Sequence, residues 1–197
     1  MARTSTIVRK TNETQITLEL NLDGSSYENK SGVGFFDHML DHIGRHGKLG
    51  LKVACKGDTQ VDDHHSVEDI GIAFGLALKE ALGDKRGIER YGSAAVPMDE
   101  TLARVALDLS GRPSLVFRVE PESFSKYAVP IGTFDVQLVQ EFFNAVANHA
   151  GMNLHIEVPW GSNNHHIAEG IFKAFGRALR EAVKVTGTEI PSTKGVI

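Results

Sequence analysis

The sequence HHSVEDIGIAFGLALKEAL, residues 64–82, returns in altered form as HHIAEGIFKAFGRALREAV at residues 165–183. The two stretches carry the same residue at 11 of 19 positions, which indicates a duplication rather than a chance likeness. Upstream of them, ETQITLELNLDG (13–24) aligns with ETLARVALDLSG (100–111) at a constant offset. The chain is therefore expected to contain two copies of one unit.

The junction between the copies, GIERYGSAAVPMDE (87–100), keeps apolar and aromatic residues and contains no polar linker. We therefore expect residues 1–86 and 87–197 to pack together as one compact domain. A chain of 197 residues with 41% hydrophobic residues is long enough to bury such a core.

Composition excludes several classes of partner. The formal net charge is -4 and no long Lys/Arg run occurs, which argues against nucleic acid or a membrane surface. Cys55 is the single cysteine, and neither a secretory leader nor an apolar run of about 20 residues is present. We expect a cytoplasmic protein that acts on a small molecule.

Periodicity indicates similar elements in both copies. Ile16, Leu18 and Leu20 alternate with polar residues, as do Val105 and Leu107, which is typical of strands with one buried face. The spacing in 35–47 and 135–151 favours helices closed by glycine, and further strands are expected at 51–55 and 152–158. Asp62/Asp63 and Asn163/Asn164 are expected to cap the long helices that begin at the histidine pairs. Each copy should run strand, strand, helix, strand, helix, an α+β arrangement.

The histidine pairs carry the spacing of metal ligands. Residues four apart share one helix face, and the first histidine of each pair lies four residues before a glutamate: His64 and Glu68, His165 and Glu169. The second histidine, His65 or His166, is turned by roughly 100° about the helix axis. If the two helices approach with approximate twofold symmetry, each second histidine completes the site of the other helix.

A single HHxxE pattern is more often only the polar start of a helix. Two copies that keep His, His and Glu while the residues between them differ favour metal ligation. Imidazole and carboxylate ligands suit Mn, Fe or Zn, and the lack of thiolates argues against a structural zinc site.

Five ordered motifs resemble those of the imidazoleglycerol-phosphate dehydratase family, and the resemblance covers nearly the whole chain. They are FDHMLDH (36–42), DDHHSVEDI (62–70), DLSGRP (108–113), NNHHIAEGIFKAFGRALR (163–180) and PSTKGVI (191–197). The implied fold has duplicated units, each a mixed four-stranded sheet with two helices on one face, and the helices pack between the two sheets.

The resemblance also implies two manganese ions per active site. One would be held by His38, His65, His165 and Glu169, and the other by His64, Glu68, His166 and Glu141. Relatives often have histidine in place of Glu141, but a carboxylate can also bind manganese. Three other histidines have weaker claims and are expected to lie on the surface or to support ligands: His42, His46 and His149.

The family reaction removes water from imidazoleglycerol phosphate and gives imidazoleacetol phosphate, in histidine biosynthesis. The proton that is lost lies beside the imidazole ring, where no carbonyl acidifies it. The resemblance implies that both ring nitrogens bind manganese, which stabilises the ring as imidazolate. It assigns the acid/base role to Glu13, which on the residues alone is an ordinary solvated charge.

A phosphorylated substrate also requires cations and hydrogen-bond donors. By family position these are Arg90, Arg112, Lys173, Ser192, Thr193 and Lys194, although each taken singly is more often a surface residue. Lys173 aligns with Ile72 of the first copy, so only the second copy has a cation at this position. This difference fits a substrate with one phosphate group, which needs a cation on one side only.

Crossed ligation can form within one chain or between neighbouring chains. The resemblance implies the second, a homo-oligomer of 24 subunits built from trimers with active sites at subunit interfaces. Two other function classes remain open at this point: a dinuclear metallohydrolase and a metal-storage protein. The substitution Glu13→Gln separates a lyase from these alternatives. A lyase should lose turnover and keep its metal, whereas the function of a storage protein should be unaffected.

Overall fold

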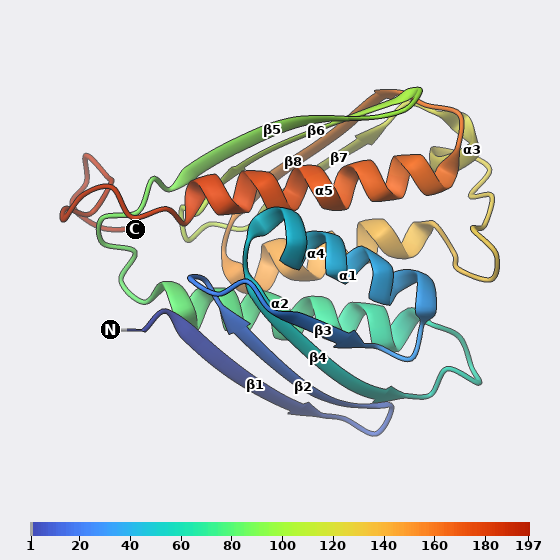
Figure 1. Cartoon of the computed structure of the whole chain (residues 1–197), viewed down its shortest axis with the longest axis horizontal. Coiled ribbons are helices and arrows are strands. Elements are labelled where there is room, and N and C mark those ends of the chain that lie inside the picture. The colour runs from blue at the N-terminus through green and yellow to red at the C-terminus, as the bar shows by residue number, and fades with distance from the viewer. Residues whose placement is uncertain (1) are drawn as a thin grey trace.

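Two four-stranded sheets enclose the long helices in the computed structural model, which describes residues 2–197 (Figure 1). The first repeat consists of β1 (Thr4–Lys10), β2 (Thr14–Asn21), β3 (Tyr27–Lys30), α1 (Gly34–Gly47), β4 (Gly50–Gly57) and α2 (His64–Leu82). The second consists of β5 (Tyr91–Met98), β6 (Thr101–Asp108), β7 (Ser114–Val119), α3 (Glu122–Ser125), α4 (Gln137–Ala150), β8 (Asn153–Trp160) and α5 (Asn164–Ala182). The expected duplicated α+β fold is confirmed.

Both sheets have the same topology, with strand orders β1-β2-β4-β3 and β5-β6-β8-β7. The first three strands of each order are antiparallel neighbours, and the last pairs in parallel with β4 or β8. The mixed four-stranded sheet that the resemblance implied for each repeat is confirmed, whereas the element order expected from periodicity omitted one strand in each repeat. That strand was missed because β3, YENK, has no fully buried residue, so its sequence carries no alternating apolar face.

The core lies between the sheets and joins the two repeats. The alternating residues Ile16, Leu18 and Leu20 of β2 are buried, as the sequence predicts. Helices from different repeats pack on each other, α1 on α5 and α2 on α4. The second contact is close because Gly71 has no side chain: a Cβ there would lie 2.8 Å from the backbone oxygen of Phe142. None of the helices in residues 2–197 has the length and apolar character needed to cross a membrane.

The four long helices α1, α2, α4 and α5 all begin at the same end of the molecule, on the right in Figure 1. The histidine pairs therefore share this end, which we call the histidine end. The C-terminal segment lies at the opposite end, which we call the tail end. α5 has 19 residues, and at a rise of about 1.5 Å per residue the two ends are about 28 Å apart.

Candidate metal centre

The second histidine pair begins a capped helix. The side-chain oxygen of Asn163 accepts hydrogen bonds from the backbone N–H groups of His165, at 2.9 Å, and His166, at 3.4 Å. This confirms the expected cap. Of the pair Asp62/Asp63 that was expected to cap α2, Asp63 does not do so, because it has helical backbone angles and its side chain makes no capping bond. Asp62 instead accepts from the backbone N–H of His64 at 2.8 Å.

A group of imidazoles surrounds the Glu169 carboxylate, whose side chain is only 9% exposed. Glu169 Oε2 lies 3.0 Å from His165 Nε2 and 3.6 Å from His38 Nε2, and Oε1 lies 3.4 Å from His42 Nε2. Ligand atoms of His38, His42 and Glu169 all lie within 4.8 Å of one another. The structure therefore brings together three of the four residues expected at one ion, and it adds His42.

His42 lies closer to the expected metal ligands than the sequence analysis predicts. His38 and His42 are four residues apart on α1, so they share a face, and their Nε2 atoms are 3.2 Å apart. That spacing was the available signal. Only the packing of α1 on α5 shows that this face meets Glu169.

Charge and burial keep Glu169 and His42 in the protonation states that bind a cation. Burial alone would raise the pKa of Glu169, but the Lys173 ammonium at 2.5 Å, together with His42 and His165, lowers that pKa to about 2. Burial lowers the pKa of His42 to about 4. At neutral pH the carboxylate is therefore ionised and the His42 ring is neutral, which is the state in which both groups bind a metal ion.

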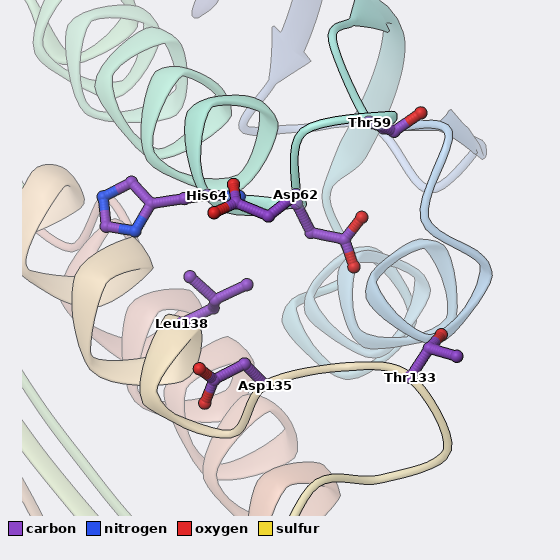
Figure 2. Close-up of a pocket in the computed structure, with 7 residues that line it drawn as sticks. Thr59, Asp62, His64, Thr133, Asp135 and Leu138 are labelled. Atoms are coloured by element: carbon purple, nitrogen blue, oxygen red, sulfur yellow. The ribbon is translucent and has the colours of Figure 1, made fainter.

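His64 and Glu68 form the corresponding pair on α2, with His64 Nε2 3.9 Å from Glu68 Oε2. His64 lines a cavity of about 320 Å³ with Asp62 and Asp135, from the loops before α2 and α4, and with Leu138 in the first turn of α4 (Figure 2). Glu141, on α4, lines a different cavity of about 500 Å³ beside β7 and α3.

The second histidine of each pair faces a carboxylate of its own repeat. His65 Nδ1 lies 3.0 Å from Asp58, and His166 Nδ1 lies 2.8 Å from Glu100. The hydrogen bonds to Asp58 and Glu100 raise the pKa of His65 and of His166. His65 Nε2 is also 3.9 Å from the Glu13 carboxylate. Within residues 2–197 neither ring lies in the clustered ligand group of His38, His42 and Glu169, so one chain does not complete the crossed arrangement there.

The expected phosphate-binding residues do not lie together. Lys173 is midway along α5, where it contacts Glu169 and lies 3.5 Å from the sulfur of Met98. Arg90 is at the tail end, where its guanidinium donates to Asp108 at 2.7 and 3.0 Å and to the backbone oxygen of Pro191 at 2.8 Å.

The remaining expected phosphate ligands are also at the tail end. Ser192, Thr193 and Lys194 form a turn, closed by the hydrogen bond from Gly195 N–H to the Ser192 oxygen. Arg112 lies in the turn between β6 and β7, next to Gly111, whose added Cβ would lie 3.5 Å from the backbone of Ile197. The tail thus returns to the segment that carries Arg112.

Known proteins resemble the chain over almost its entire length. A profile of the imidazoleglycerol-phosphate dehydratase family matches residues 31–179. A Jannaschia protein with that name is 56% identical over 197 residues, with 98% of each chain covered. A solved dehydratase of this name from Staphylococcus aureus has a TM-score of 0.82 and 42% identity, covering 93% of this chain and 99% of that one. One from Pyrococcus furiosus has a TM-score of 0.81 and 34% identity, covering 97% and 100%.

Together with these relatives, the duplicated fold and its histidine end define the class of protein: the chain is an enzyme, a dehydratase. The alignment with the Jannaschia protein covers 98% of each chain. The chain belongs to the imidazoleglycerol-phosphate dehydratase family.

Proposed function

We propose that this chain converts imidazoleglycerol phosphate to imidazoleacetol phosphate and water, as a cytoplasmic enzyme of histidine biosynthesis that uses two manganese ions per active site. The observation that carries the proposal is the group around Glu169: in this member of the family, His38 Nε2 and His165 Nε2 lie 3.6 and 3.0 Å from the Glu169 carboxylate, within reach of one ion. Those donors are the imidazole and carboxylate types that suit such an ion.

The ligand set of each ion follows the crossed scheme. One ion would be held by His38, His65, His165 and Glu169, and the other by His64, Glu68, His166 and Glu141. When bound, the ions supply Lewis-acid stabilisation of the imidazole ring of the substrate. His42, 3.4 Å from Glu169, either joins the first set or holds that carboxylate in place.

Glu13 has the freedom that a proton-transferring residue needs. Its side chain is 52% exposed in the turn between β1 and β2, and its carboxylate points toward His65 without forming a hydrogen bond at 3.9 Å. A carboxylate placed beside a metal ligand but not tied down can take the proton from the substrate carbon and return it to the departing hydroxyl.

Apart from Lys173, the residues expected to bind the substrate phosphate lie at the tail end of the chain. Along α5 that end is about 20 Å from the metal ligand Glu169. Arg112, Lys194, Ser192 and Thr193 are at the tail end, and Arg90 there is already bonded to Asp108 and Pro191. A substrate of this size cannot span that separation. We propose that the tail end of one subunit meets the histidine end of a neighbour in a homo-oligomer, which we expect to have 24 subunits built from trimers.

A turnover assay tests the activity. Protein stripped with a chelator should form no imidazoleacetol phosphate, and adding Mn²⁺ should restore product formation. Glu13→Gln should remain inactive while it still binds Mn²⁺. Release of inorganic phosphate in place of the dehydrated product would identify a metallohydrolase, and Mn²⁺ binding with no turnover of any phosphorylated imidazole would identify a storage protein.

Native mass measurement tests the assembly. We expect a species of about 24 subunits with Mn²⁺ bound and smaller species after chelation. A monomer in both states would reject the shared active site, because the single chain keeps its two ends apart.

A further inference from the structure

The duplication places a glutamate at the same position in both repeats, yet the two residues have different surroundings. Glu13 occupies the turn between β1 and β2, and Glu100 the turn between β5 and β6. Glu100 is tied at both oxygens: Oε1 accepts backbone N–H groups of Ser162 at 3.1 Å and Asn163 at 2.9 Å, and Oε2 lies 2.8 Å from His166 Nδ1. Glu13 makes no comparable side-chain bond within the part of the chain that the structure describes.

The first repeat supplies the missing contact from another segment. Asp58, in the loop between β4 and α2, lies 3.0 and 3.2 Å from His65 Nδ1 through its two oxygens. The corresponding loop between β8 and α5 is shorter, residues 161–163, and contains no acidic residue. Each repeat therefore has one carboxylate on Nδ1 of its second histidine, but the two carboxylates come from non-equivalent positions.

We propose that Asp58 and Glu100 are positioning residues that keep a proton on Nδ1 of His65 and His166 and so present Nε2 to the metal ions. An ionised carboxylate can only accept, so the facing ring nitrogen must carry the proton. Carboxylates of this kind fix the tautomer and orientation of metal-bound histidines. Because Asp58 fills this role in the first repeat, Glu13 is free for proton transfer, whereas its duplicate Glu100 is not. The inference rests on the proposed metal-dependent function.

The hydrogen bonds of Glu100 mean that the substitution Glu100→Gln tests the tautomer of His166. In Glu100→Gln the amide oxygen stays with the backbone N–H groups of Ser162 and Asn163, so the amide NH₂ faces His166 Nδ1. An NH₂ group can only donate, so Nδ1 must give up its proton and Nε2 must take it. Nε2 would then carry a proton at the position where a metal ion needs a lone pair.

Asp58 provides the opposite case. Among residues 2–197 its side-chain oxygens are hydrogen-bonded only to His65 Nδ1, so in Asp58→Asn the amide can turn its oxygen toward that nitrogen. The tautomer of His65 is then kept. Asp58→Ala removes the acceptor altogether and leaves the ring free to rotate.

Manganese affinity of the full-length protein distinguishes these variants when the EPR signal of free Mn²⁺ is followed during titration. We expect Glu100→Gln and Asp58→Ala to bind Mn²⁺ about 10- to 100-fold more weakly at one ion per chain. Asp58→Asn should bind as the unaltered protein does. Glu13→Gln is the matched control, the same substitution at the duplicate position, and it should keep full Mn²⁺ affinity while losing turnover.

Several results would overturn the inference. Unchanged Mn²⁺ affinity in Glu100→Gln would do so, as would equal weakening in Asp58→Asn and Asp58→Ala, because charge rather than the tautomer would then matter. Equal weakening in Glu13→Gln and Glu100→Gln would show that the duplicates share one role. If Glu100→Gln does not fold, the two Asp58 variants decide alone. Failure of the unaltered protein to bind Mn²⁺ would instead reject the proposed function.

Discussion

Mixed oligomers test whether one active site draws on two chains. We consider one chain with Glu13→Gln, altered at the histidine end, and another with Arg112→Met and Lys194→Met, altered at the tail end. Each protein alone should be inactive. A site shared between chains needs an unaltered histidine end from one subunit and an unaltered tail end from another. In an equal mixture each condition is met at about half of the positions, so about one quarter of the sites should be intact.

The assay is the specific activity of oligomers co-expressed with two different affinity tags and purified over both. Activity of about a quarter of the unaltered value is expected, adjusted for the measured subunit ratio. As a control, all three changes are placed in one chain and co-expressed with unaltered protein. A shared site again gives about a quarter, whereas a site within one chain gives about a half. No activity in the first mixture together with a half in the second would refute the reasoning from the separation along α5.

Three further predictions concern stability. Gly92→Ala should lower the free energy of unfolding by about 1–3 kcal/mol or more in denaturant titrations, because the added Cβ would lie 1.9 Å from a backbone oxygen of α5; Gly34→Ala, with nothing within 4 Å, should have little such effect. Asn163→Ala should cost about 1 kcal/mol in thermal or chemical unfolding, since the cap of α5 is lost, and an unchanged midpoint would contradict this assignment. Metal-free protein should lose stability as pH falls from about 6.5 to about 4, because the depressed pKa of His42 means that the unfolded chain binds the proton first. After allowance for solvent screening we expect about 2 kcal/mol from His42. The loss should be smaller in His42→Gln, where the lowered pKa of His46 still contributes, and an equal loss in that variant would exclude His42 as a cause.

The candidate site could be predicted only where it is local. The pairing of His165 with Glu169 follows from helical spacing, and the structure gives it at 3.0 Å. The contact of His42 with Glu169 depends on how α1 packs on α5, and no spacing within either helix encodes that. Neither does the sequence show which ring nitrogen meets Asp58, because the loop that carries Asp58 has no regular period.

The sequence by itself determined the duplication, the buried faces of strands such as β2 and the helices that carry the histidine pairs, because each is recorded in residues close together in the chain. Tertiary structure alone decided that β3 and β7 join the sheets in parallel and that Glu13 and Glu100 have different partners. It also decided that the metal ligands and the tail-end cations lie at opposite ends of one chain. These features depend on contacts between segments distant in sequence, and packing of the whole chain is what sets such contacts.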